Sequence, residues 1–123
     1  MKMAKILVVD DDPDILKLLR FKLSQEGYKV IVAVDAYIGI QTANREKPDL
    51  IILDIMMPAG GGYHTLKNIR LTSHGSQTPI VVLTGMQDPE LKKKIEAEGV
   101  EAYMQKPLDY PLLSETIKKL LSV

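Results

Sequence analysis

Five short runs of apolar, largely β-branched residues recur along this 123-residue chain, separated by segments whose apolar residues have helical spacing. Continuous apolar runs, as opposed to alternating ones, indicate strands that are buried on both faces of a sheet. Helical connections between such strands favour parallel pairing through right-handed crossovers. We therefore expect a single α/β domain over residues 1–123, a doubly wound (βα)5 fold with helices on both faces of a five-stranded parallel sheet. The expected strands are 5–9, 28–34, 50–53, 79–83 and 100–104.

Signals for helix ends occur between these strands. Asp12 followed by Pro13 has the pattern of an N-cap and first helical residue, and Asp88 with Pro89 repeats it. Gly27 and Gly99 are expected to end the helices that begin there. The segment LLSETIKKLL near the end of the chain is amphipathic and predicts a final helix.

One glycine-rich segment interrupts the pattern after the third strand. Pro58 is followed by the run Ala59-Gly60-Gly61-Gly62. The run is too short to separate two domains, so we expect a mobile loop there.

Composition excludes several classes of function. Sixteen basic and sixteen acidic residues give a net charge of +0, so no basic field favours nucleic acid or an anionic membrane. The absence of cysteine excludes disulfide and thiolate chemistry and is compatible with a reducing compartment. The apolar run near the N-terminus is cut off by Asp10, too early for a signal peptide or a membrane span. We expect a cytoplasmic protein that binds neither nucleic acid nor membrane.

The residues that can do chemistry come directly after the predicted strands. Asp10 and Asp11 follow the first, Asp54 the third, Thr84 the fourth and Lys106 the fifth. In open parallel sheets, ligands bind outside the carboxyl ends of the strands, where the strand order reverses. Three carboxylates at such an edge suit a hard divalent cation, Mg²⁺ or in its place Mn²⁺. A lysine ammonium and a threonine hydroxyl beside them can bind phosphoryl oxygens.

Asp54 is the residue that we expect to react. Its backbone is fixed by the preceding strand LIIL, and a positioned carboxylate can attack phosphorus to form an acyl phosphate. Neither His64 nor His74 lies near this edge in the predicted topology, so a phosphohistidine donor has to belong to another protein.

Simpler interpretations exist for some of these residues. The run Asp10, Asp11, Asp12 taken alone also fits a solvated turn with a helix cap, and we assign Asp12 to that role. Thr84 and Tyr103 taken alone fit ordinary strand residues, because both residue types favour strands.

Taken together, the motifs resemble a response-regulator receiver domain of bacterial two-component signalling. The resemblance covers essentially the whole chain and is carried by KILVVDDDPDIL, LIILDIMMP, VVLTG and AYMQKP. It implies the strand order 2-1-3-4-5. It also implies that Asp11 and Asp54 ligate Mg²⁺ with the backbone carbonyl of Met56, that Asp10 acts partly through water, and that the Lys106–Pro107 peptide bond is cis.

The resemblance further implies a phosphorylation switch and not a turnover enzyme. A sensor histidine kinase or a histidine phosphotransfer protein is expected to phosphorylate Asp54, with Lys106 and Thr84 assisting. Thr84 then moves inward, Tyr103 rotates into the space, and the face formed by the fourth helix, fifth strand and fifth helix changes its binding of a downstream effector that the sequence does not identify. We expect a monomer, with at most a weak dimer after phosphorylation.

Two departures from the family pattern concern methionines. Met56 and Met86 occupy the positions that, by the resemblance, flank the path of the hydrolytic water. Their flexible apolar side chains should obstruct water, so we expect slow autodephosphorylation.

Two alternative functions stay open. One is a receiver-like interaction module that never turns over phosphate, and the other is a small phosphatase with an aspartate nucleophile.

Overall fold

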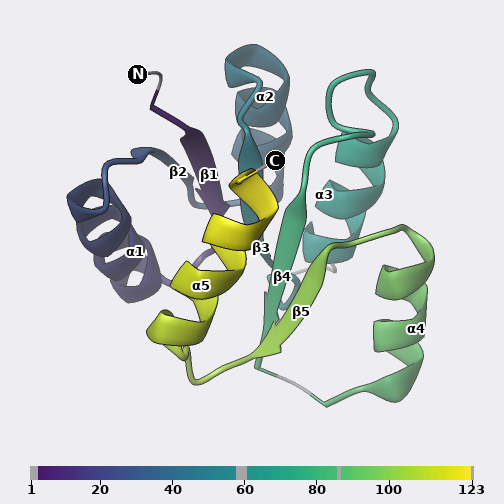
Figure 1. The fold of residues 1–123 in the computed structure, drawn as a ribbon. Coiled ribbons are helices and arrows are strands. Elements are labelled where there is room, and N and C mark those ends of the chain that lie inside the picture. Colours follow the sequence, from purple (N-terminus) through teal and green to yellow (C-terminus); the bar gives the residue numbers. More distant parts are fainter. Residues whose placement is uncertain (1–2, 58–60, 86, 123) are drawn as a thin grey trace.

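The structure is a computed structural model that describes residues 3–57, 61–85 and 87–122 (Figure 1). Strands and helices alternate along this part of the chain, as the apolar pattern predicted. The elements are β1 (Lys5–Val9), α1 (Pro13–Gln25), β2 (Lys29–Ala33), α2 (Ala36–Glu46), β3 (Leu50–Asp54), α3 (Gly61–Arg70), β4 (Ile80–Thr84), α4 (Pro89–Ala97), β5 (Ala102–Gln105) and α5 (Tyr110–Leu121).

The sheet is parallel throughout, with the strand order β2-β1-β3-β4-β5. This confirms the predicted doubly wound fold and its strand order. Val9 of β1 is paired with Leu53 of β3. The residues that follow this pair, Asp10 and Asp54, therefore leave adjacent strands at the same level.

The helices cover the sheet in two layers. Helices α1 and α5 lie on one face, and α2, α3 and α4 lie on the other (Figure 1). Apolar side chains from both faces of the strands are buried, which explains why the strand sequences are continuously apolar. The first face packs around Leu19 and Ile117, and the second around Leu66 and Ile95.

The helix ends follow the local sequence signals. The side chains of Asp12 and Asp88 accept hydrogen bonds from the backbone amides of the first turns of α1 and α4, which confirms both predicted caps. Gly27 and Gly99 have φ angles of +96° and +82°, a region that favours glycine, and both follow the helices they were predicted to end.

The prediction for the glycine-rich segment is wrong in part. Gly61 and Gly62 are buried in the first turn of α3 and do not belong to a loop, while Pro58, Ala59 and Gly60 lie outside the described residues. A Cβ atom at Gly62 would lie 2.3 Å from the Cα of Ile55. Glycine is needed there because the helix begins against the backbone that leaves β3.

The predicted fifth strand is also shifted. It begins at Ala102 instead of at residue 100, because the segment before it is held from the side. The Arg70 guanidinium donates to the Gly99 carbonyl and to the Glu101 carboxylate, and the latter also accepts from the Ile80 amide.

None of the described helices has both the length and the apolar character that crossing a bilayer requires.

Candidate functional site

The carboxyl edge of the sheet brings the predicted site residues together. Asp10 follows β1, Asp54 and Thr84 are the last residues of β3 and β4, and Lys106 follows β5. These four strands are paired in register, so these side chains meet at one edge. The position at the switch point of the strand order is the usual place for a ligand in this architecture.

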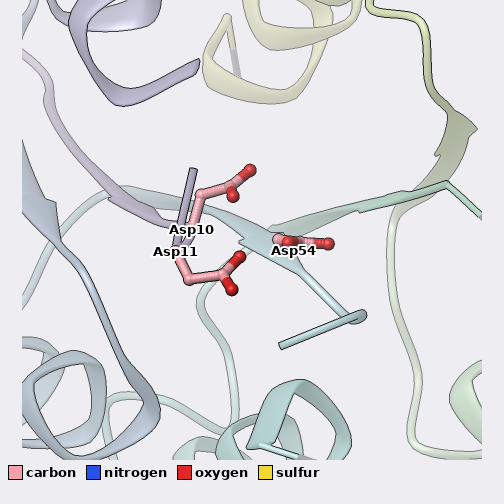
Figure 2. A group of neighbouring side chains, drawn as sticks. All are labelled: Asp10, Asp11 and Asp54. Carbon is pink, nitrogen blue, oxygen red and sulfur yellow. The ribbon is translucent and has the colours of Figure 1, made fainter. Parts of the chain in front are cut away.

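Three carboxylates lie side by side at this edge. Oxygen atoms of Asp10, Asp11 and Asp54 are all within 4.8 Å of one another, and Figure 2 shows the three side chains grouped where β1 and β3 end. Asp10 and Asp54 are almost fully buried, with exposed fractions of 1% and 2%, whereas Asp11 is exposed. Two buried acids and one exposed acid therefore form a site that opens to solvent on the side of Asp11.

Backbone amides fix the two buried carboxylates. Oδ1 of Asp10 accepts from the amide of Asp12 at 2.9 Å, and Oδ1 of Asp54 accepts from the amide of Met56 at 3.0 Å. Each acid thus binds the chain two residues further on, which holds its side chain at the strand end. Asp10 and the phosphoacceptor candidate Asp54 are thus positioned by the local turns that follow β1 and β3.

Lys106 supplies positive charge to the cluster. Its Nζ lies 3.1 Å from Oδ2 of Asp10 and 3.6 Å from Oδ2 of Asp54. The Lys106 amide donates to the Thr84 carbonyl at 2.7 Å, and the Lys106–Pro107 peptide bond is cis, as the resemblance implied. The lysine is anchored at its backbone and reaches both buried acids with its ammonium group.

The electrostatics of the site show an excess of negative charge. Burial raises the pKa of Asp10 to about 6, and repulsion by Asp54 adds to this, while the Asp12 amide and Lys106 oppose it. Burial opposes the charge of Lys106, but attraction to Asp10 and Asp54 outweighs it and raises the pKa of the lysine. One ammonium group thus pairs with two buried acids here, and a third acid, Asp11, lies close by.

The donor set fits a magnesium ion. Its ligands would be carboxylate oxygens, which hard divalent cations prefer, and Mg²⁺ commonly uses few protein ligands besides waters and phosphate oxygens. An added cation would also relieve the repulsion that raises the pKa of Asp10. Asp10, Asp11 and Asp54 are the residues able to hold it.

The predicted switch residues lie on the two strands beyond β3, Thr84 on β4 and Tyr103 on β5. Thr84 is fully buried at the end of β4, beside Gln105 of β5. Tyr103 is half-buried, and Nζ of Lys92 lies 5.3 Å from the centre of its ring. The side chain of Met56 is partly exposed, and Met86 lies outside the described residues.

The sequence analysis missed the residues that follow β2. Val34, Asp35 and Tyr37 line a cavity that also includes Asp11. Their position in the sequence was a usable signal, because the carboxyl ends of all strands in a parallel sheet lie at the same edge, and these residues directly follow a predicted strand. It was overlooked because VDAY contains no obvious catalytic pattern.

Comparison with known proteins agrees with the geometry of the site. Residues 6–118 match the family of the response regulator receiver domain. The chain belongs to this family. Receiver domains are signalling switches and not classic turnover enzymes; they interact with histidine kinases and effectors, and they bind Mg²⁺ at an acidic pocket.

Individual receiver proteins are similar over nearly the whole chain. The chain is 39% identical to the alkaline phosphatase synthesis transcriptional regulatory protein PhoP of Bacillus subtilis over 95% of its own length and 48% of PhoP. It is 31% identical to the protein PilH of Pseudomonas aeruginosa, over 98% of the chain and 99% of PilH. The solved chemotaxis protein CheY4 of Vibrio cholerae superposes with a TM-score of 0.90 at 33% identity, covering 98% of the chain and 100% of CheY4. The chain therefore spans about half of PhoP and nearly all of the other two.

Proposed function

We propose that Asp54 accepts a phosphoryl group from a phosphohistidine of a sensor histidine kinase or histidine phosphotransfer protein. The observation that carries the proposal is the geometry around Asp54: a buried carboxylate at a strand end, with Lys106 Nζ at 3.6 Å and two further carboxylates within 4.8 Å. An ordinary structural aspartate has no need of two more acids beside it, because like charges repel in a buried place.

The transfer is a displacement at phosphorus. A carboxylate oxygen of Asp54 forms a bond to phosphorus as the bond from phosphorus to the imidazole nitrogen breaks, and the imidazole keeps the electron pair. The Met56 amide orients the attacking carboxylate, and Lys106 and the Thr84 hydroxyl bind the transferred oxygens. Asp10, Asp11, Asp54 and the Met56 carbonyl would hold Mg²⁺, which when bound neutralises charge on the acceptor and on the phosphoryl group.

We further propose that phosphorylation changes the face formed by α4, β5 and α5. Thr84 moves toward the phosphoryl oxygens, and Tyr103 rotates into the space that Thr84 leaves. Lys92 now lies over the Tyr103 ring, so this rotation would break a cation–π contact. An effector that binds one ring position better than the other would then read the phosphorylation state.

The protein would act as a cytoplasmic monomer that dimerises at most weakly when phosphorylated, within one receiver domain over residues 1–123. PilH and CheY4 match over almost their whole length, whereas PhoP is about twice as long as the match. The downstream output therefore depends on what this domain binds or is joined to.

Labelling with a small phosphodonor tests the function directly. Phosphoramidate with Mg²⁺ should add one phosphoryl group to the wild-type chain, detected by intact mass, and Asp54→Asn should take up none. Equal labelling of the variant would contradict the assignment. Beryllofluoride with Mg²⁺ should bind tightly, whereas an interaction module that never turns over phosphate should ignore it. Multiple turnover on small phosphomonoesters would instead indicate the phosphatase.

The lifetime of the phosphoryl group tests the role of Met56. We expect slow autodephosphorylation, because the partly exposed thioether beside Asp54 obstructs the approach of water. Met56→Asn should shorten the lifetime several-fold, on the order of 3- to 10-fold, by admitting a polar group that can bind water. Leu71→Asn, an exposed residue beyond α3, is the control and should leave the lifetime unchanged. An unchanged lifetime in the Met56 variant would remove the explanation.

A further inference from the structure

A cavity of about 330 Å³ adjoins the acidic site on the side of Asp11. It lies between the segments that follow β1, β2 and β3, so it opens at the same edge of the sheet as the site. We call it the Asp11 pocket. Its lining residues are Asp11, Val34, Asp35, Ala36, Tyr37 and Met57.

Apolar side chains are unusually exposed around this pocket. Val34 is 51% exposed and Tyr37 is 70% exposed, and both belong to its lining. Ile38 and Met56, which neighbour lining residues in the chain, are partly exposed as well. Four of the nine exposed large apolar residues in the described chain therefore lie in the segments that directly follow β2 and β3, including the first turn of α2. Single exposed apolar residues are ordinary, but a group of them beside a functional site indicates a binding surface.

The pocket walls are held in place without a ligand. The Asp35 carboxylate caps α2 by accepting from the Ile38 amide at 2.8 Å. The Tyr37 hydroxyl accepts from Nε2 of Gln41 at 2.8 Å, which fixes the ring against its own helix. These two contacts hold Asp35 and Tyr37 on α2, which reduces the ordering entropy that is lost when a partner group binds there.

We propose that the Asp11 pocket receives an apolar side chain of the protein that donates the phosphoryl group to Asp54. The inference rests on the proposed function and identifies a contact by which the donor is positioned. Asp11 is a wall of the pocket, and its carboxylate lies within 4.8 Å of that of Asp54. A donor that brings phosphorus to Asp54 therefore comes close to the wall of this pocket.

The spacing suits a donor whose histidine lies on a helix. Residues one helical turn apart lie about 5–6 Å from each other on the same face. On a helix that crosses the site toward Asp11, a histidine placed over Asp54 would thus have a neighbour, one turn away, on the side of the Asp11 pocket. The pocket would select donors with an apolar residue at that position.

The charge at the rim favours the same occupant over a second copy of this chain. Asp11 and Asp35 are both exposed and both line the pocket, so its rim is acidic. A second copy placed symmetrically would bring acid against acid, which costs affinity. A donor helix with basic residues beside its apolar one complements the rim.

Another apolar surface provides a rival and a control. Phe21 is exposed on α1 beside Lys17 and Arg20, and this surface shares no lining residue with the Asp11 pocket. Leu71 is 83% exposed and follows α3, at the opposite edge of the sheet from the site. Each can be changed to serine without disturbing a buried residue.

The test compares two kinds of donor. The phosphorylated cores of the sensor kinases encoded in the same genome are screened against the wild-type chain, and the one that transfers fastest is the protein donor. Phosphoramidate is the donor without a docking surface. We measure transfer to the wild type, Val34→Ser/Tyr37→Ser, Phe21→Ser and Leu71→Ser, and express each as the ratio of the protein-donor rate to the phosphoramidate rate. The double variant should lower this ratio about 10-fold, mainly through the KM for the donor, because two central apolar contacts are lost.

The outcomes separate the inference from the proposed function. A ratio unchanged in the double variant, or lowered equally by Leu71→Ser, would overturn the docking inference. A ratio lowered more by Phe21→Ser than by the double variant would overturn it as well, because the surface on α1 would then be the one that positions the donor. Transfer from phosphoramidate with none from any kinase would also overturn it. Failure of phosphoramidate itself to label Asp54 would instead overturn the proposed function.

Cysteine labelling provides a second measurement. The chain contains no native cysteine, so Tyr37→Cys and Leu71→Cys each carry a single thiol. The donor should slow maleimide labelling at position 37 several-fold and leave position 71 unaffected. Equal labelling rates at position 37 with and without the donor would contradict docking at the Asp11 pocket.

Discussion

Asp10 and Glu26 are both acids held by several hydrogen bonds or ion pairs, yet their surroundings shift their pKa values in opposite directions. Burial raises the pKa of Asp10 to about 6. Donation from the Tyr110 hydroxyl lowers the pKa of Glu26, with help from Ser114 and Lys118 and against a smaller effect of burial. The first acid is part of the site, and the second joins the end of α1 to α5.

The difference is one of charge balance. In the site, one ammonium group serves Asp10 and Asp54, with Asp11 close by. In the cluster around Glu26, one carboxylate accepts from Tyr110 and from Ser114 and pairs with Lys118 at 3.4 Å. A balanced cluster stabilises the fold, whereas a buried excess of one charge costs stability and leaves affinity for an ion of the other sign.

The largest effect should come from removing charge at the site. In a chelating buffer at pH 7, Asp10→Asn should raise the free energy of unfolding by about 2 kcal/mol, because a carboxylate with a raised pKa is disfavoured in the folded state when ionised. The sign follows from the raised pKa: the advantage of Asn should vanish near pH 4 and develop as the pH rises toward 6. Urea unfolding of the variant and the wild type at pH 4 and at pH 7 measures this difference in unfolding free energy.

The same substitution should impair the function. Phosphorylation by phosphoramidate with Mg²⁺ should fall at least about 10-fold, because a proposed ligand of the ion is lost. If Asp10→Asn destabilised the protein at neutral pH, the Asp10 cluster would not carry the excess of negative charge that distinguishes it from the Glu26 cluster.

Magnesium should give the next largest effect. Adding 10 mM Mg²⁺ to the wild type should raise the free energy of unfolding by about 1.4 kcal/mol for a dissociation constant of about 1 mM, because the ion binds only the folded site. Glu26→Gln should respond like the wild type, and Asp11→Asn should respond much less. Thermal unfolding with and without the ion tests this, and an equal response of Asp11→Asn would exclude the carboxylate cluster as the binding site.

The two regions also differ in how far the sequence predicts them. Asp10, Asp54 and Lys106 could be placed together because the ends of parallel strands coincide, so a position in the sequence becomes a position in space. Glu26 and Tyr110 lie 84 residues apart on different segments, and their contact depends on how α1 and α5 are rotated on the sheet. No local sequence pattern predicts how these two helices are rotated.

Two further features were not predicted from the sequence, and both also depend on how helices pack on the sheet. The run around Gly62 was expected to be a loop because glycine adopts many backbone conformations. The structure instead uses glycine to let α3 approach Ile55 closely, and that approach depends on tertiary packing. The exposure of Tyr37 beside Asp11 likewise depends on the packing of α2. Patterns along the chain predict strands, caps and strand-end acids, and they do not predict contacts between helices.

Glu26→Gln should have a smaller effect than either change at the site, and in the destabilising direction. We expect a loss of about 0.5–1 kcal/mol, since the amide keeps some hydrogen bonds but loses their charge assistance and the pairing with Lys118. Glu115→Gln removes a highly exposed acid that pairs with Lys119 in the same helix, and as the matched control it should change stability by less. Phosphorylation of Asp54 should be normal in both. Stabilisation by Glu26→Gln would show that this cluster, too, carries a charge excess.

The pH dependence of the Glu26 contribution should be the smallest effect and the sharpest comparison. Because the pKa of Glu26 is lowered in the folded state, its stabilisation is fully present above the ordinary value of 4.5 and is lost as the pH falls through the folded pKa. The difference in unfolding free energy between the wild type and Glu26→Gln should therefore be constant from pH 6 to 8 and shrink below pH 4.5. Asp10 titrates in both proteins, so its opposite trend cancels from this difference. A difference that grew on acidification would mean that Glu26, like Asp10, is held in a place that disfavours its charge.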